Sequence, residues 1–347
     1  MKNKKEVFEE FFSKYGSLIE KSHNEEVSKN KKKKKKYVIE MISLMILTII
    51  FIYIIYTNQI NAIYKTCITL LFCLFALGLS IVNLRIINNL NKDSCYIINA
   101  LIYDMILKFL SNKDFCFEIA TEISESDFNR INLFNMNYLK YTGSNLTAAT
   151  YKNKKFVMCD VWLYDLIERI KTDSYYSKYD NTFYITNYHY HDRINIFKGL
   201  YYETTINRDN NAYIYMIPNN LNDKFIQKNI YHYISYSGTK IELENLEFSE
   251  RYSVFSFDEI KSRYILSLTL MEKINRLDKL ITNKKYFVFK PDGRVGIFID
   301  EFQIDNIINR KFDLNKKISK EYLYNIFITV NKLFDISQIL EDFNPYS

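Results

Sequence analysis

The sequence predicts a membrane-anchored α+β protein, in which a two-helix transmembrane hairpin precedes a cytoplasmic mixed domain with a mostly antiparallel sheet. Two apolar stretches, 37–57 and 66–84, lie almost back to back, and a run of lysines precedes the first. After residue 112, short strand-and-turn segments dominate. The predicted order is an amphipathic helix with a lysine run (1–36), the hairpin (37–84), a helix that leaves the membrane (85–111) and a cytoplasmic α+β domain (112–347).

The first segment, residues 5–20, has the spacing of an amphipathic helix. Its apolar side chains recur every three or four residues, and its glutamates occupy the rest of the helical wheel. Such a helix either lies on the membrane, docks on the cytoplasmic domain or packs in an oligomer. We favour docking or oligomer packing, because anionic lipid repels an acidic helix.

The two apolar stretches are long enough to cross a bilayer. The hydrocarbon core is ~30 Å thick, so a helix with a rise of ~1.5 Å per residue needs ~20 residues. Only Glu40 and Lys65 carry charge between residues 37 and 84. The lipid bilayer is therefore the first expected partner.

Basic residues predict the orientation of the hairpin, because lysines beside a span stay on the cytoplasmic side. Arg85 and Lys92 follow the second stretch. We therefore expect a multi-pass protein of the cell membrane with both termini in the cytoplasm. The lysine run is also expected to attract anionic lipid at ~1 kcal/mol per residue, which is compatible with a topology signal. The run that directly precedes the first stretch consists of Lys31, Lys32, Lys33, Lys34, Lys35 and Lys36.

The charge distribution argues against a nucleic-acid partner. The chain carries a formal charge of +7, but residues 1–36 hold 12 lysines and six glutamates. Residues 37–84 hold one charge of each sign, so only +1 remains for the other 263 residues. A domain that is nearly neutral lacks the basic surface that phosphate binding needs.

Beyond residue 112, alternating apolar and polar residues predict several short strands. Helical spacing predicts two helices among them, one over 124–135 and one over 161–171 that holds the only tryptophan, Trp162. We expect Trp162 to be a core residue. The predicted strands are 115–121, 146–151, 154–159, 182–189, 193–205 and 212–217.

Two capping boxes are the sharpest local signals in this domain. Ser256 with Glu259 predicts the start of a helix, and Thr269 with Glu272 predicts the start of the next, because each hydroxyl and glutamate can bond reciprocally to the first turn. The turn 291–293 (Pro-Asp-Gly) then predicts a β-hairpin, and a helix is expected over 319–340.

The only histidine cluster lies around His189 and His191. On a strand both side chains project from one face, so they are weak candidates for a metal site that Asp192 or His232 would complete. Nothing fixes a third ligand, so an exposed strand or turn is favoured. We expect no metal and no cofactor.

Catalytic residues cannot be assigned from motifs. The chain has no GxxxxGK[ST], GxSxG or HExxH pattern. A catalytic site built from carboxylates stays open, since such residues have no local signature.

Five segments of the chain form a pattern that can be compared with known families: Phe197–Tyr202, Met216–Pro218, Phe248–Phe255, Arg263–Leu266 and Leu270–Glu272. Together they resemble a bacterial family of membrane-anchored proteins that is known only as a domain of unknown function. The resemblance extends over roughly residues 90–340 and implies the same layout, with a helical region, two spans and a mixed cytoplasmic domain. It implies no activity.

The leading hypothesis is therefore non-enzymatic: a membrane-tethered cytoplasmic binding or scaffold module with a protein partner. The alternative is a membrane-associated enzyme that uses Asp and Glu residues on lipid or envelope precursors. A channel is a weaker third option, because two uncharged spans offer no pathway unless many subunits assemble, and a homo-oligomer stays open. A deep polar pocket with converging carboxylates would favour the enzyme, and an exposed apolar groove or sheet edge the binding module.

Overall fold

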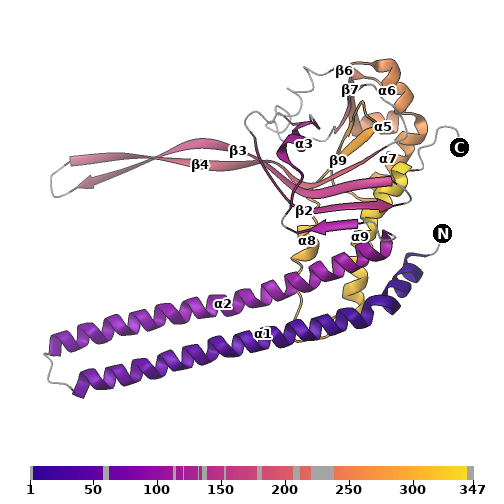
Figure 1. Ribbon diagram of the computed structural model, residues 1–347. Coiled ribbons are helices and arrows are strands. Elements are labelled where there is room, and N and C mark those ends of the chain that lie inside the picture. Colours follow the sequence, from indigo (N-terminus) through magenta and orange to yellow (C-terminus); the bar gives the residue numbers. More distant parts are fainter. Residues whose placement is uncertain are drawn as a thin grey trace. The chain divides into compact units, whose positions relative to one another are not determined.

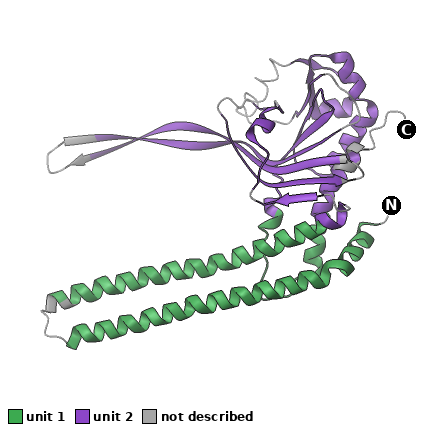
Figure 2. Ribbon diagram, in the orientation of Figure 1, with its two compact units in different colours: residues 1–106, 307–328 green, residues 107–306, 329–347 purple. Residues whose placement is uncertain are grey.

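The protein divides into two compact units (Figure 2). Residues 1–106 and 307–328 form unit 1, and residues 107–306 and 329–347 form unit 2. The 307–328 segment thus belongs with the N-terminal helices rather than with the sheet domain that precedes it in the chain. The computed structural model describes residues 3–57, 62–111, 115–119, 121–131, 133–134, 139–151, 154–177, 182–205, 212–219 and 238–341.

Unit 1 is built on two long helices that pack together, α1 (Lys4–Thr57) and α2 (Ala62–Leu110) (Figure 1). Both are long and apolar enough to cross a membrane, by length and composition. The amphipathic segment, the lysine run and the first apolar stretch are one continuous helix, because nothing in that sequence breaks it. Phe51 and Phe72 stack between the two helices with ring centroids 4.2 Å apart.

The amphipathic start of α1 packs on the protein, as the packing interpretation predicted. Phe8 contacts the rings of Tyr324 and Phe327 at 5.0 and 5.5 Å, in the first turns of α9 (Lys320–Glu341). Phe8 and Phe11 are buried. The ion pair between Lys320 and Glu9, at 2.6 Å, borders this contact.

Unit 2 contains a sheet of nine strands among the described residues, and every strand pair is antiparallel. The order across the sheet is β1-β2-β3-β4-β9-β8-β5-β7-β6. The expected α+β fold with an antiparallel sheet is confirmed. The strands are β1 (Phe115–Glu118), β2 (Lys140–Tyr151), β3 (Lys154–Ser177), β4 (Thr182–Thr205), β5 (Ile214–Pro218), β6 (Thr239–Ile241), β7 (Tyr252–Ser256), β8 (Lys285–Phe289) and β9 (Arg294–Asp300).

Helices cover the centre of the sheet on both faces. On one face, Phe128 of a short helix packs edge-on against Tyr201 and Phe298, with ring centroids 5.8 Å apart in each pair. On the other face, Phe334 of α9 packs edge-on against Phe156 at 5.5 Å. The remaining helices are α3 (Glu125–Asn129), α5 (Leu246–Arg251), α6 (Glu259–Ile265), α7 (Leu268–Leu280) and α8 (Asp305–Ile308).

The helix predicted over 161–171 is wrong, because this segment lies inside β3. It pairs residue by residue with β4, and its β-branched and aromatic side chains suit a pleated strand. Trp162 is half-buried on β3 rather than in a helix. The helix predicted over 124–135 starts where expected, since Ser124 caps α3, but it ends at Asn129.

Both capping boxes are misplaced. The N-cap of α6 is Asp258, whose Oδ1 accepts from the Lys261 N–H at 3.0 Å. Ser256 is instead the buried last residue of β7, where pairing to β5 and β6 holds its backbone in a strand. Glu259 is the first residue of α6 and forms an ion pair with Arg263 at 2.9 Å, not a capping box.

Helix α7 begins at Leu268, one residue before the predicted cap. Ser267 occupies the N-cap position without a side-chain hydrogen bond. Thr269 therefore lies inside the first turn, and Glu272 is exposed further along the helix. The buried stripe of Leu270, Ile274 and Leu277 sets where this helix starts.

Strands β3 and β4 continue far beyond the sheet as a two-stranded ribbon (Figure 1). Strand β2 pairs with β3 only as far as Tyr164, and β9 pairs with β4 only from Gly199 onward. We call residues 165–177 and 182–194 the arm. Within the arm, each strand pairs with the other and with no further strand among the described residues.

Candidate functional site

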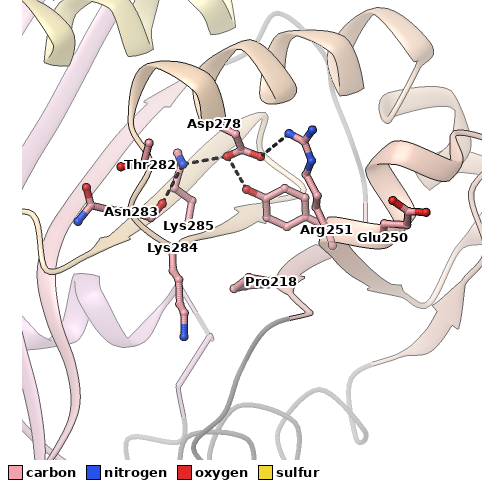
Figure 3. Close-up of a pocket in the computed structure, with 9 residues that line it drawn as sticks. Pro218, Glu250, Arg251, Asp278, Thr282, Asn283, Lys284 and Lys285 are labelled. Carbon is pink, nitrogen blue, oxygen red and sulfur yellow. Dashed lines mark hydrogen bonds and ion pairs between the residues drawn. The ribbon is translucent and has the colours of Figure 1, made fainter.

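A pocket of 270 Å³ opens where β5, β7 and β8 end, beside α5 and α7 (Figure 3). It is a polar pocket in which charged side chains converge. Three basic and two acidic residues line it, with a tyrosine, a threonine, an asparagine and a proline. The lining residues are Pro218, Glu250, Arg251, Tyr252, Asp278, Thr282, Asn283, Lys284 and Lys285.

Asp278, in the last turns of α7, is the centre of this pocket (Figure 3). Its Oδ1 accepts from Tyr252 Oη at 2.8 Å and lies 2.8 Å from Lys285 Nζ. Arg251 Nη1 lies 3.8 Å from Oδ2. One carboxylate therefore has two cations and a phenol as partners. The first residues of β7 and β8 supply the phenol and the lysine, and the last residue of α5 supplies the arginine.

Lys285 is held as a structural cation. Its side chain is only 2% exposed, and burial lowers its pKa while Asp278 opposes that change. An ammonium has three hydrogens, and those of Lys285 reach Asp278, the Ile281 carbonyl and the Asn283 carbonyl. No hydrogen is left for a substrate, and a charged lysine has no lone pair for attack.

Tyr252 is likewise committed to the protein. Burial, together with the neighbouring Asp278 charge, raises the pKa of its phenol well above the usual range. A phenol in that state donates a hydrogen bond and is not a nucleophile at neutral pH. The charged groups at the centre of the pocket, Asp278 and Lys285, and the Tyr252 phenol are therefore bonded to the protein itself.

A carboxylate with a lysine, a tyrosine and an arginine as partners recurs at the other end of β8. Lys290 Nζ lies 2.6 Å from Glu203 Oε2, and Tyr201 Oη donates to the same oxygen at 2.5 Å. Arg294 Nη1 lies 3.4 Å from Glu203 Oε1. Lys290, like Lys285, is 2% exposed. Two such clusters, one at each end of one central strand, indicate that buried ion pairs anchor β8.

Asp160, on β3, is a second buried carboxyl, at a pocket of 230 Å³. It is 2% exposed and accepts from the backbone N–H groups of Ile304 and Asp305 at 2.6 and 2.7 Å. Asn145 Nδ2 donates to it at 2.8 Å. Burial raises its pKa to about 6 despite these donors. Asp160 thereby fastens the start of α8 to the sheet.

The histidine pair lies in the arm. His189 and His191 share one face of β4, as alternation predicts, and both are exposed. His189 Nδ1 lies 2.8 Å from Glu168 Oε1 across the ribbon. Asp192 faces the opposite side, where it pairs with Arg169 at 3.2 Å. Among the described residues no group of three or more metal-ligand side chains forms, and His232 lies outside them.

The arm exposes apolar side chains on both of its faces. Ile170 and Ile185 lie on one face, 61% and 66% exposed. The other face presents Tyr175, Tyr188 and Tyr190, which are also exposed. Both outer edges carry backbone groups that pair with no strand in the described part of the chain. The arm is thus an exposed sheet edge with apolar faces.

The six lysines of the run lie on α1, directly before its apolar part. Lys34 is half-buried and donates to Asn91 Oδ1 of α2 at 2.6 Å. The other five are exposed, and Lys36 lies 3.9 Å from Glu40.

Comparison with known proteins gives one match. Residues 195–344 match a family model described as "Protein of unknown function (DUF3137)". No curated protein and no solved structure matches the chain. The match begins at residue 195, directly after the arm ends in β4. The arm and both long N-terminal helices therefore lie outside the matched residues. Residues 195–344 are therefore similar to a domain of unknown function, DUF3137.

Proposed function

We propose that this protein is a two-pass, membrane-anchored binding module that holds a protein partner through the β3–β4 arm, with both termini in the cytoplasm. The observation that carries the proposal is the arm itself. It is an exposed, two-sided ribbon outside the core of the sheet, which is the feature expected of a binding module rather than of an enzyme.

Physical chemistry supports a partner on the arm. A two-stranded ribbon alone is marginally stable in water, and three or more strands are needed for independent stability. The side chains of Ile170 and Ile185 expose apolar surface to water as long as no partner covers them. A partner segment that pairs with either open edge satisfies the backbone and covers these side chains together.

The anchor rests on the apolar parts of α1 and α2. Each is long enough for the hydrocarbon core, and the lysine run with Arg85 supports a cytoplasmic position for both ends. A reporter enzyme that is active only outside the membrane, fused after Ser347, should give no signal. Strong activity of that fusion would overturn the orientation.

A second candidate function is a carboxylate enzyme at the Asp160 pocket, acting on lipid or envelope precursors. The observation that favours it is the pKa of about 6, which suits proton transfer near neutral pH. Against it, two backbone N–H groups and an amide already bond to the Asp160 oxygens. The binding module is therefore the better supported function.

The test is site-specific photo-crosslinking in cells. A photoreactive amino acid at Ile170 or Ile185 should give a discrete larger product on irradiation. The matched control is Ile260 on α6, which is also strongly exposed but lies outside the arm. Products from all three sites, or from none, would contradict the arm as the partner-binding surface.

A further inference from the structure

The lysines of the run are distributed around their helix, with Lys34 on the side of α2 and the other five on the remaining sides. At 3.6 residues per turn, six consecutive residues of α1 complete about 1.7 turns. We call Lys31–Lys36 the lysine ring. In the described part of the chain, no ion pair forms with four of its members, and only the other two have protein partners, Asn91 and Glu40. The four without ion pairs are Lys31, Lys32, Lys33 and Lys35.

The height of the ring matches one layer of a bilayer. Residues 37–57 rise about 31 Å along α1, which spans a hydrocarbon core of ~30 Å. The bilayer is ~40–45 Å thick with its headgroups, so each headgroup layer is roughly 5–8 Å deep. Six residues rise about 9 Å. With 37–57 in the membrane, the lysine ring therefore occupies the headgroup layer.

Helix α2 leaves the positive charge of the ring uncompensated. Asn30 Nδ2 donates to the Leu90 carbonyl at 2.9 Å, and Lys34 donates to Asn91. These contacts place residues 88–92 of α2 beside the ring. That segment reads Asn-Asn-Leu-Asn-Lys and contains no carboxylate.

We propose that the lysine ring is a binding site for anionic phospholipid headgroups and collects such lipids around the helical hairpin. A protein partner contacts one side of a helix, whereas this charge faces all sides except that of α2. Lipid headgroups are the anionic surroundings that enclose a transmembrane helix at this height. The inference rests on the membrane anchor proposed above.

The test uses the full chain, purified in mild detergent, with phosphatidylglycerol and phosphatidylcholine competing in mixed micelles. Native mass spectrometry then gives the ratio of the two lipids bound per chain. Changing Lys31, Lys32, Lys33 and Lys35 to Gln should reduce the preference for phosphatidylglycerol roughly tenfold or more, since each lysine near an anionic surface contributes up to about fivefold. Because micelles have no inner and outer side, this test does not depend on which side of the membrane the termini occupy.

The control changes four exposed lysines of unit 1 outside the ring to Gln: Lys14, Lys21, Lys311 and Lys316. It removes the same charge and should leave the preference unchanged, as should Arg in place of the four ring lysines. High salt should weaken the preference, and inorganic phosphate should not compete.

An equal loss in the ring and control variants would overturn the proposal, as would no loss in either. Competition by inorganic phosphate would instead indicate a general anion site and would also overturn it. Carbonate extraction separates this result from the proposed function. If carbonate releases the chain from membranes without detergent, both the anchor and the lipid site are wrong. An integral protein without lipid preference disproves the lipid site alone.

Discussion

At the scale of single residues, the most consequential groups are buried charges with partners far along the chain. Lys290 and Glu203 are 87 positions apart, and Asp160 bonds to backbone groups 144 and 145 positions away. No local pattern marks any of them. The only sequence signal is that Lys285 and Lys290 enclose the apolar run of β8. A lysine beside a strand is usually exposed, so that signal predicts nothing by itself.

Lys285→Met should destabilise unit 2 strongly. The change removes Lys285, the cation closest to Asp278, and leaves this carboxylate uncompensated. Breaking a buried ion pair in this way costs on the order of 3 kcal/mol. Trp162 is the only tryptophan, so its fluorescence reports the melting of unit 2. Lys284→Met, one residue away and without an ion pair of its own among the described residues, is the control. Equal melting temperatures for the two variants would show that the Asp278 cluster does not anchor β8.

Asp160 should give unit 2 a distinctive dependence on pH. Its folded pKa, about 6, lies above the ordinary aspartate value of 3.8, so the folded state binds more protons between these two pH values. Stability from this group is therefore fully present below pH 4 and falls as pH rises through about 6, by up to roughly 3 kcal/mol. The melting temperature of the native chain minus that of Asp160→Asn should thus decrease from pH 4 to 7. A constant difference would refute the raised pKa.

At the scale of elements, hydrophobic pattern and turn chemistry predict more than helix caps do. The hairpin around Pro291-Asp292-Gly293 is confirmed, because β8 and β9 pair on either side of this turn. Gly293 has a φ of 76°, a conformation that residues with a side chain adopt only at a cost. The caps failed because Ser256 is drawn into β7 by two neighbouring strands. The apolar spacing of 161–171 fits a helix equally well, and only pairing with β4 decided that it is a strand.

Helix α6 tests the corrected cap. Asp258→Ala should lower the stability of unit 2 by about 1 kcal/mol, because the Lys261 N–H loses its acceptor. Thr269→Ala should have a much smaller effect, since Thr269 lies inside α7 and caps nothing. Thermal unfolding of both variants, followed at Trp162, makes the comparison. A larger loss of stability from Thr269→Ala than from Asp258→Ala would instead support the helix caps predicted from the sequence.

The arm should be dispensable for folding. Ile167 and Asp192 are paired, so replacing residues 168–191 with Asn-Gly closes the ribbon with a tight two-residue turn. We expect the melting temperature to change by no more than a few degrees, because the removed residues that the structure describes pair only with each other. A large loss of stability would mean that the arm belongs to the core.

At the scale of the whole molecule, the compact units do not follow the order of the chain. The sheet domain was expected to end the sequence as one piece, yet residues 307–328 belong to unit 1. Their aromatic side chains pack on Phe8 and Phe11 of α1, which a fragment of the sheet domain alone would lack.

A fragment of residues 107–347 should therefore bind a synthetic peptide of residues 3–28. The peptide restores the apolar contact with Tyr324 and Phe327, so it should raise the melting temperature of the fragment. The same peptide with Phe8→Ala and Phe11→Ala should do neither. Titration calorimetry measures the binding of each peptide, and thermal unfolding of the fragment with each peptide gives the melting temperature. Equal binding of the two peptides would show that this aromatic contact does not hold the segment.

The sequence by itself determined the features that depend on local pattern. Length and hydropathy of 37–57 and 66–84 predicted the two long apolar helices, and alternation with turns predicted an antiparallel sheet. Tertiary structure decided what depends on distant pairing: the register that extends β3 and β4 into an arm, the buried charges at both ends of β8, and the place of 307–328 with α1. The physical reason is that burial and hydrogen-bond partners, which fix these features, come from residues that the chain brings together only when it folds.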